Sequence, residues 1–182
     1  LGGIYKKIGI KPDMVVYGKA MGNGYAISAV VGKKKVMNAA QSTFVSSVAW
    51  TEKVGFAAAL GVINFHKKKK VFVKIKKIGK YIKNEWVRIA KKNKIKIVVN
   101  ELDSAINFTF ENKNDYLSTL FTELMLSKKF LATNNVYISF YHHLDIVKKY
   151  LKAVEWSFKK ISEDFNGKKR FLSSKVRNYD YK

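Results

Sequence analysis

A long run of apolar residues at helical spacing, within residues 67–93, most constrains how this chain can fold. The apolar side chains follow one another at intervals of three and four, and lysines fill most of the gaps; they are Val71, Ile75, Ile78, Ile82, Trp86 and Ile89. This spacing predicts one long amphipathic helix, whose apolar stripe needs another layer to cover it. The lysine run 67–70 is then the solvated start of this helix.

The residues after this helix alternate between strand and helix patterns. Residues 95–99, 105–110 and 136–140 have the length and apolar content of strands, and residues 115–129 have helical spacing. A final helix is predicted with Asp145 as its N-cap. Its inward stripe comprises Val147, Tyr150, Leu151, Val154, Phe158, Ile161 and Phe165. Together these elements predict a small α+β domain.

The residues before the long helix predict two strands joined by a glycine-bearing loop. Residues 14–17 and 26–31 are the strands, and Asn23-Gly24 between them is a turn dipeptide that tolerates positive φ. A helix is predicted from Thr51 to Phe65, with alanines and a glycine forming a face that another element can approach closely. We therefore expect domains at residues 1–65 and 66–165, followed by a basic tail at residues 166–182.

The composition excludes several classes of function. The chain lacks cysteine, and its three histidines show no metal-ligand spacing, so no metal site is predicted. No apolar run approaches the ~20 residues that span a bilayer, and no secretory signal is visible, so a cytoplasmic protein without a membrane partner is expected. The first residue is Leu1 and the opening residues carry no cap or targeting pattern, which predicts that the sequence starts inside a larger protein.

A formal charge of +23 raises the possibility of a nucleic-acid-binding module. However, only three residues are arginine, the side chain best shaped for phosphate and guanine contacts, and lysine is spread through every segment. We therefore interpret the charge as solvated helix faces and do not expect nucleic acid as the main partner.

A resemblance to a known family begins at residues 11–37, KPDMVVYGKAMGNGYAISAVVGKKKVM. This segment resembles the cofactor-lysine segment of class III aminotransferases, which depend on pyridoxal phosphate (PLP). The similarity continues through residues 45–65, VSSVAWTEKVGFAAALGVINF, and residues 116–161, in the branch that includes glutamate-1-semialdehyde 2,1-aminomutases. The resemblance implies an α/β, fold-type I PLP-dependent transferase. Residues 1–65 would be the C-terminal part of its large domain, and residues 66–165 its small α+β C-terminal domain.

The resemblance assigns Lys19 as the residue that holds PLP, as a Schiff base. A primary amine suits this role because it condenses with the cofactor aldehyde and is exchanged for the substrate amine. A free lysine titrates near ~10.4, so burial or neighbouring charge must lower that value before Lys19 acts as a base. Gly18, Gly22 and Gly24 would let the backbone approach the cofactor, although an ordinary turn explains them equally well.

In the family a threonine binds the cofactor phosphate of the partner subunit, which implies a homodimer with a shared active site. The aligned residue here is Val48, which has no hydroxyl, so Ser47 is the expected phosphate ligand. Ser46 or a backbone N–H could substitute, and Thr43 fits only with a shifted alignment. The resemblance gives no role to the pair at residues 142–143, both histidine, and places no arginine in a substrate-binding segment.

The family's pyridine-binding aspartate, its stacking aromatic residue and its main phosphate loop lie upstream of the lysine. We therefore expect an inactive fragment of an active parent, which transfers an amino group from a small-molecule donor to a carbonyl acceptor. Aminotransferase and aminomutase chemistry both stay open, as does a racemase or decarboxylase of the same fold. The alternatives are a basic nucleic-acid-binding module and a catalytically degenerate relative.

Overall fold

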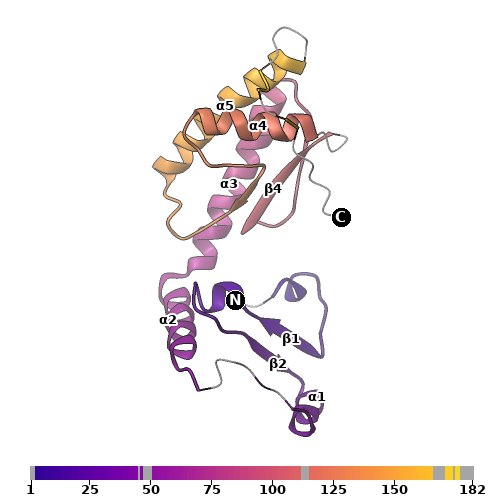
Figure 1. Ribbon diagram of the computed structural model, residues 1–182, viewed down its shortest axis with the longest axis vertical. Helices are drawn as coiled ribbons and strands as arrows, with labels where there is room; N and C mark the ends of the chain where they lie inside the picture. The colour runs from indigo at the N-terminus through magenta and orange to yellow at the C-terminus, as the bar shows by residue number, and fades with distance from the viewer. Residues whose placement is uncertain are drawn as a thin grey trace. The chain divides into compact units, whose positions relative to one another are not determined.

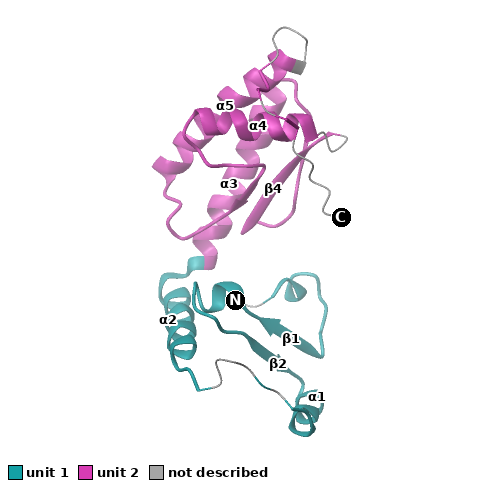
Figure 2. Cartoon of the chain, viewed as in Figure 1, with its two compact units in different colours: residues 1–71 teal, residues 72–182 magenta. Residues whose placement is uncertain are grey.

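The computed structural model describes residues 3–44, 46, 51–111, 115–165, 171–173 and 175–176. Two units, Leu1–Val71 and Phe72–Lys182, make up the chain, and each is described by itself (Figures 1 and 2). The domain boundaries expected from the sequence, after residues 65 and 165, stay predictions. No helix in the described ranges combines the length and apolar character needed to cross a membrane.

The first unit is built around an antiparallel strand pair, which confirms the predicted strand–loop–strand. β1 (Met14–Tyr17) pairs with β2 (Ala29–Gly32), with Met14 opposite Gly32 and Tyr17 opposite Ala29. β2 begins three residues later than predicted. The sequence did not indicate the short helices around this pair, which are η1 (Ile4–Lys6), η2 (Lys19–Met21), α1 (Lys34–Asn38) and η3 (Ala39–Ser42).

The long amphipathic helix predicted at residues 67–93 is confirmed, but it begins four residues later than predicted, because the preceding helix extends through the lysine run. α2 (Val54–Lys69) ends where Lys70 adopts a left-handed φ of 48°, and α3 (Val71–Lys92) begins directly afterwards. The N–H of Lys70 donates to the carbonyl of His66, which closes the last turn of α2. Residues 67–69 therefore end one helix and do not start the next. α2 also begins at Val54, so Thr51 is not its N-cap.

The second unit packs three helices against a three-stranded antiparallel sheet. Its strands are β3 (Ile97–Val99), β4 (Ala105–Phe110) and β5 (Asn135–Tyr137), in the spatial order β3-β4-β5. α3, α4 (Asp115–Ser127) and α5 (Leu144–Phe165) supply the helices. This confirms the predicted α+β unit. Asp145 lies inside the first turn of α5 and is not its N-cap, because the Val147 N–H already donates to His143.

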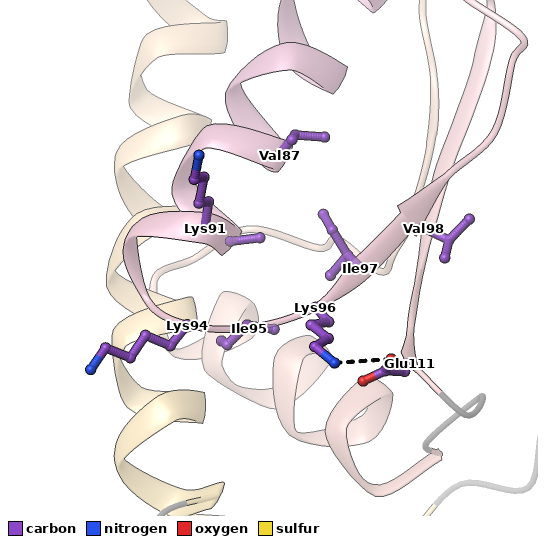
Figure 3. Close-up of a pocket in the computed structure, with 9 residues that line it drawn as sticks. Val87, Lys91, Lys94, Ile95, Lys96, Ile97, Val98 and Glu111 are labelled. Carbon is purple, nitrogen blue, oxygen red and sulfur yellow. Dashed lines mark hydrogen bonds and ion pairs between the residues drawn. The ribbon is translucent and has the colours of Figure 1, made fainter.

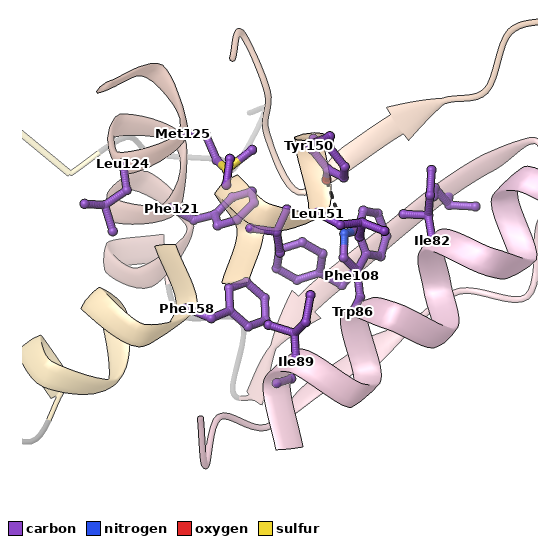
Figure 4. Packing of buried hydrophobic residues seen from close by; sticks show 14 of the residues in the cluster. Ile82, Trp86, Ile89, Phe108, Phe121, Leu124, Met125, Tyr150, Leu151 and Phe158 are labelled. Atoms are coloured by element: carbon purple, nitrogen blue, oxygen red, sulfur yellow. Dashed lines mark hydrogen bonds between the residues drawn. The ribbon is translucent and has the colours of Figure 1, made fainter. Parts of the chain in front are cut away.

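The core of the second unit is centred on Phe108 of β4. Its ring makes edge-to-face contacts with Trp86 of α3, Phe121 of α4 and Phe158 of α5, with centroids 5.0, 5.1 and 5.5 Å away (Figure 4). Aromatic contacts of this geometry stabilise a core by about 0.5–1.5 kcal/mol each beyond the area they bury. The predicted stripes of α3 and α5 face this centre, and their members Ile82, Ile89, Val147, Val154 and Ile161 are almost completely buried.

The turn between β3 and β4 is held tightly against α3. A Cβ on Gly79 would lie 1.8 Å from the carbonyl oxygen of Asp103, so only glycine allows this approach. One turn further along α3, Lys83 Nζ pairs with the Asp103 carboxylate at 2.8 Å and donates to the carbonyls of Asn100 and Glu101 at 3.2 Å. These contacts fix the position of the hairpin on the helix.

Candidate active site

Lys19 is placed by the end of a strand and the start of a tight turn. β1 ends at Tyr17, Gly18 is extended, and Lys19 opens η2 with a left-handed φ of 49°. The turn is closed by hydrogen bonds from the Met21 N–H to the Gly18 carbonyl and from the N–H groups of Gly22 and Asn23 to the Lys19 carbonyl. A left-handed residue with a Cβ costs about 1–2 kcal/mol. The turn therefore holds Lys19 in a backbone conformation that lysine rarely adopts.

The side chain of Lys19 is exposed, and its amine is available for chemistry. Within the described parts of the chain, its Nζ forms no ion pair or hydrogen bond. Lys33, at the other end of the strand pair, differs, because its Nζ lies 2.6 Å from the Asp13 carboxylate. Among the described residues, the Lys19 amine is therefore exposed and unpaired.

Steric contacts and backbone conformation within the chain explain the glycines of this loop. A Cβ on Gly22 would lie 2.1 Å from the carbonyl oxygen of Tyr25 and 2.8 Å from Ile27, so the turn has no room for a side chain there. Asn23 and Gly24 have φ values of 47° and 110°, which confirms the positive φ predicted for this dipeptide. A Cβ on Gly18 would make an ordinary van der Waals contact with Ser28 Cβ, 3.7 Å away. That these glycines make room for the cofactor stays a prediction.

The start of α2 packs closely against the residues leading into β2. Gly55 is buried, and a Cβ there would lie 2.9 Å from the Ala26 carbonyl oxygen and 3.2 Å from Ile27. Of the small residues predicted to form a close-packing face, Ala59 is buried one turn after Gly55, whereas Gly61 has nothing within 4 Å of its Cβ position. Ile27 touches both Gly22 and Gly55, so the lysine turn and α2 share a neighbour.

Two contacts within the first unit fix the position of β1, the strand that leads into the Lys19 turn. The Tyr5 and Tyr17 hydroxyls lie 3.1 Å apart, and this hydrogen bond raises the pKa of Tyr17. At the other end of the strand, Lys33 pairs with Asp13 and its N–H donates to the Asp13 carbonyl. No local pattern indicates the Tyr5–Tyr17 pair, because local patterns do not report contacts between residues twelve positions apart.

The expected phosphate ligands are only partly described. Ser47 and Val48 lie outside the described residues, so their predicted roles stay predictions. Ser46 is exposed, whereas the Thr43 hydroxyl donates to the Ala40 carbonyl at 2.9 Å at the end of η3. The Thr43 hydroxyl is thus already hydrogen-bonded within its own turn.

The remaining candidates lie in the second unit and have structural contacts. His142 Nδ1 accepts a hydrogen bond from the Ser139 N–H at 2.9 Å, which holds the turn before α5. The Arg88 guanidinium pairs with Glu85 at 2.9 Å, and Arg170 and Arg177 lie outside the described residues. Across the described ranges, no three histidine, aspartate or glutamate side chains gather as metal ligands.

The comparisons with known proteins complete this picture. The family model described as "Aminotransferase class-III" matches residues 4–122, which include Lys19 and its turn. The chain belongs to the class III aminotransferase family. The match begins at η1 and extends through β3 and β4 into α4, so it covers all of β1, η2 and β2.

Curated relatives in the class III family include both aminotransferases and aminomutases. The chain is 32% identical over 151 residues to 3-aminobutyryl-CoA aminotransferase from Cloacimonas acidaminovorans, covering 79% of this chain and 34% of that protein. It is 25% identical over 187 residues to glutamate-1-semialdehyde 2,1-aminomutase from Fusobacterium nucleatum, covering 90% and 42%. The chain thus spans less than half the length of these relatives. They give no support to the nucleic-acid-binding alternative.

Solved structures confirm the expected fold. The PLP form of the FumI protein from Sphingopyxis sp. MTA144 superposes with a TM-score of 0.81 at 22% identity, over 89% of this chain and 40% of that one. The β-phenylalanine aminotransferase from Variovorax paradoxus gives 0.78 at 16% identity, over 90% and 41%. At these identities the likeness concerns the fold, which is that of fold-type I PLP-dependent transaminases.

Proposed function

We propose that the full protein that contains this sequence transfers amino groups with PLP as cofactor, and that Lys19 anchors the cofactor. The observation that carries the proposal is the position of Lys19, which opens a tight turn after β1 within the segment matched by the class III model and whose amine is unpaired among the described residues. Membership of the family and similarity to named aminotransferases support the same chemistry.

The chemistry divides between cofactor and protein. Bound PLP supplies an aldehyde that combines with amines and a ring that accepts electrons from the substrate. Lys19 would hold this group through Nζ and, once exchanged for the substrate amine, would hold and return a proton beside the reacting carbon. The η2 turn limits where the Lys19 backbone can move, so the amine returns to one region. Ser47, or a backbone N–H near Val48, would bind the phosphate.

The test is chemical mapping of the lysine that binds PLP. The protein is incubated with PLP at less than one equivalent, reduced with borohydride and digested, and the modified peptide is identified by mass spectrometry. We expect the label to concentrate on Lys19 and the visible absorption band to disappear in Lys19→Ala. Lys35→Ala is the matched control, because Lys35 is also exposed, lies in α1 of the same unit and has no partner among the described residues.

Two outcomes would contradict the assignment. One is a label spread evenly over the exposed lysines, and the other is an unchanged absorption band in Lys19→Ala. The folded state of each variant is compared by circular dichroism, so that lost binding is not mistaken for lost structure.

The relatives include both aminotransferases and aminomutases, so whether the amino group moves between molecules or within one molecule has to be measured. We propose a small amino donor and a carbonyl acceptor as substrates, by analogy with the named aminotransferases. An aminomutase would instead move the group within one molecule, as the similarity to glutamate-1-semialdehyde 2,1-aminomutases suggests. Isotope-labelled amino donor separates them, since only intermolecular transfer moves the label to a second compound.

A homodimer with a shared phosphate site is also proposed, following the family resemblance. Mixing Lys19→Ala protein with a variant lacking the Ser47 hydroxyl tests this arrangement. If subunits share the site, hybrid dimers regain cofactor binding that neither parent shows. Hybrids that bind no better than the two parents would contradict it.

A further inference from the structure

Lys19 differs from the left-handed lysines at helix ends in what holds its backbone. Lys94 follows the last turn of α3 (Figure 3), and there the Ile95 N–H donates to the Ala90 carbonyl. A hydrogen bond of this kind at a helix end favours the left-handed conformation. Lys19 follows no helix, because it comes after β1 and opens η2. Contacts of another kind therefore have to keep its backbone left-handed.

The segment that leads into β2 passes beside the lysine turn. The register in which β1 pairs with β2, continued by one residue, puts Ser28 opposite Gly18. A Cβ on Gly18 would lie 3.7 Å from the Cβ of Ser28, which agrees with this extension. One residue further, the same register puts Ile27 opposite Lys19. Ile27 is therefore the residue of the incoming segment that lies across from the lysine.

The Ile27 side chain contacts both the lysine turn and α2. Its Cγ2 methyl group lies 2.8 Å from the position that a Cβ on Gly22 would occupy. Its Cβ and Cδ1 atoms lie 3.2 and 3.6 Å from the position of a Cβ on Gly55, in the first turn of α2. Both glycines are buried. Each glycine thus lets a different part of one isoleucine approach the backbone closely.

We propose that Ile27 is a positioning residue, which holds the Lys19 turn in its left-handed form and so fixes where the Lys19 amine can meet the cofactor. The N–H of Gly22 donates to the Lys19 carbonyl, and the turn cannot unwind at Gly22 without displacing the Cγ2 methyl group. The contact of Cδ1 with Gly55 fixes the isoleucine on α2. A disfavoured torsion persists only where several neighbours enforce it. The inference rests on the proposed role of Lys19 in holding PLP.

Two substitutions remove the two contacts one at a time. Ile27→Leu keeps the volume of the side chain but lacks the β-branch, so it loses the Cγ2 methyl group at Gly22. Ile27→Val keeps that methyl group and loses only Cδ1, the atom near Gly55. Ile10→Leu is the matched control, because it makes the first change at a 55% exposed position of the same unit. Melting temperatures report the effect of each variant on stability.

The first readout needs no cofactor. Hydrogen exchange at the Gly22 and Asn23 amides reports on the turn, because both N–H groups donate to the Lys19 carbonyl. We expect Ile27→Leu to speed this exchange about tenfold, as loss of one enforcing contact allows. Ile27→Val and Ile10→Leu keep the methyl group at Gly22 and should leave the exchange rates close to those of the wild type.

The second readout is the borohydride mapping of PLP in the full protein. The share of label on Lys19 relative to Lys35 should fall about tenfold in Ile27→Leu, because reaction between held groups is sensitive to small displacements of the amine. Ile27→Val should keep the wild-type distribution of label. A residue that only stabilises the fold would change the melting temperature without changing this distribution.

Equal effects of Ile27→Leu and Ile27→Val on the turn amides would overturn the proposal, as would an effect no larger than that of Ile10→Leu. Faster exchange with an unchanged share of label on Lys19 would also overturn it. Ile27→Ala removes both contacts and takes the place of Ile27→Leu if that variant does not fold. If PLP labels another lysine in the wild type, the proposed function fails, whereas the exchange measurement still tests whether Ile27 holds the turn.

Discussion

The indole N–H of Trp86 on α3 donates to the hydroxyl of Tyr150 on α5 across 3.2 Å inside the core of the second unit. Trp86 is completely buried and Tyr150 nearly so, at 0% and 9% exposed. This buried polar contact joins α3 and α5, which are also linked at the surface by the Lys92–Glu155 ion pair at 2.6 Å, and it satisfies the only side-chain donor that tryptophan has.

Removing the hydroxyl should therefore destabilise the protein although the ring stays in place. Tyr150→Phe leaves the Trp86 N–H without an acceptor, and a buried unsatisfied donor costs about 1–3 kcal/mol. The free energy of unfolding, measured with urea, should fall by that amount. Tyr137→Phe removes an exposed hydroxyl of the same kind and should leave stability unchanged. Equal losses from both variants would contradict the role of the pair.

The buried Tyr150 should also make the protein less stable at high pH. Burial raises the pKa of Tyr150, against a smaller lowering by the Trp86 hydrogen bond. Its contribution is therefore complete below about pH 10, where an unfolded tyrosine titrates, and is lost as the pH rises from there toward the folded-state pKa. Above pH 10 the stability advantage of wild type over Tyr150→Phe should shrink by about 1.4 kcal/mol per pH unit. Urea unfolding from about pH 8 to about pH 11 measures this difference; a constant difference would contradict it.

Phe108 should be the most costly ring to remove, because three other elements meet on it. Phe108→Ala deletes the contacts with Trp86, Phe121 and Phe158 together and should cost about 3–5 kcal/mol. Phe72→Ala, at a 46% exposed position of α3, should cost less than about 0.5 kcal/mol. Thermal or urea unfolding of both variants gives the comparison, and similar values would show that Phe108 is not the centre of the core.

Replacing either of two lysines at helix ends by glycine should stabilise the protein. Lys94 and Lys129 have φ values of 58° and 63°, and each sits in a Schellman turn where the next residue, Ile95 or Phe130, donates back to the helix. Glycine is the usual residue at this position because it has no Cβ. Lys94→Gly or Lys129→Gly should raise the free energy of unfolding by about 0.5–1 kcal/mol, whereas the alanine variants should not. Loss of stability on changing to glycine would contradict the left-handed assignment.

Two helical glycines should respond to alanine in opposite directions. Gly61 in α2 has no atom near its Cβ position, so Gly61→Ala should stabilise by about 0.5–1 kcal/mol. Gly79→Ala in α3 would push a methyl group into the Asp103 carbonyl and should cost about 1–3 kcal/mol. Melting temperatures of the two variants test this prediction. A shift of both in the same direction would mean that helix propensity alone determines the effect of alanine on stability.

Regular apolar spacing made the second unit predictable. The stripes of α3 and α5 are visible in the sequence because burial on one face of a helix imposes its period, and the structure buries their members. The position of the break at Lys70, four residues beyond the predicted boundary near residue 66, could not be predicted in the same way. The lysine run continues helical composition on both sides, and no glycine, proline or asparagine marks the left-handed residue. α1 was missed because its five residues bury nothing.

The candidate site was predictable only as far as local sequence describes it. The position of Lys19 after a strand and before a glycine turn follows from the order of residues, as does the positive φ at Asn23-Gly24. The left-handed φ of Lys19 does not, since side-chain sterics oppose it and only the surrounding turn imposes it. The Tyr5–Tyr17 and Gly55–Ala26 contacts depend on how distant segments pack, which no local pattern records.

The left-handed lysines and the crowded glycines show that this chain tolerates two kinds of misfit very differently. At Lys70, Lys94 and Lys129 a side chain sits where backbone torsion disfavours it, and the helix ends still form. At Gly22, Gly55 and Gly79 the obstacle is another atom within 3 Å of the would-be methyl group. A lysine at a position of the first kind costs about 1–2 kcal/mol of torsional energy. At a position of the second kind any side chain would collide with backbone, so steric collision, and not torsional preference, restricts these positions to glycine.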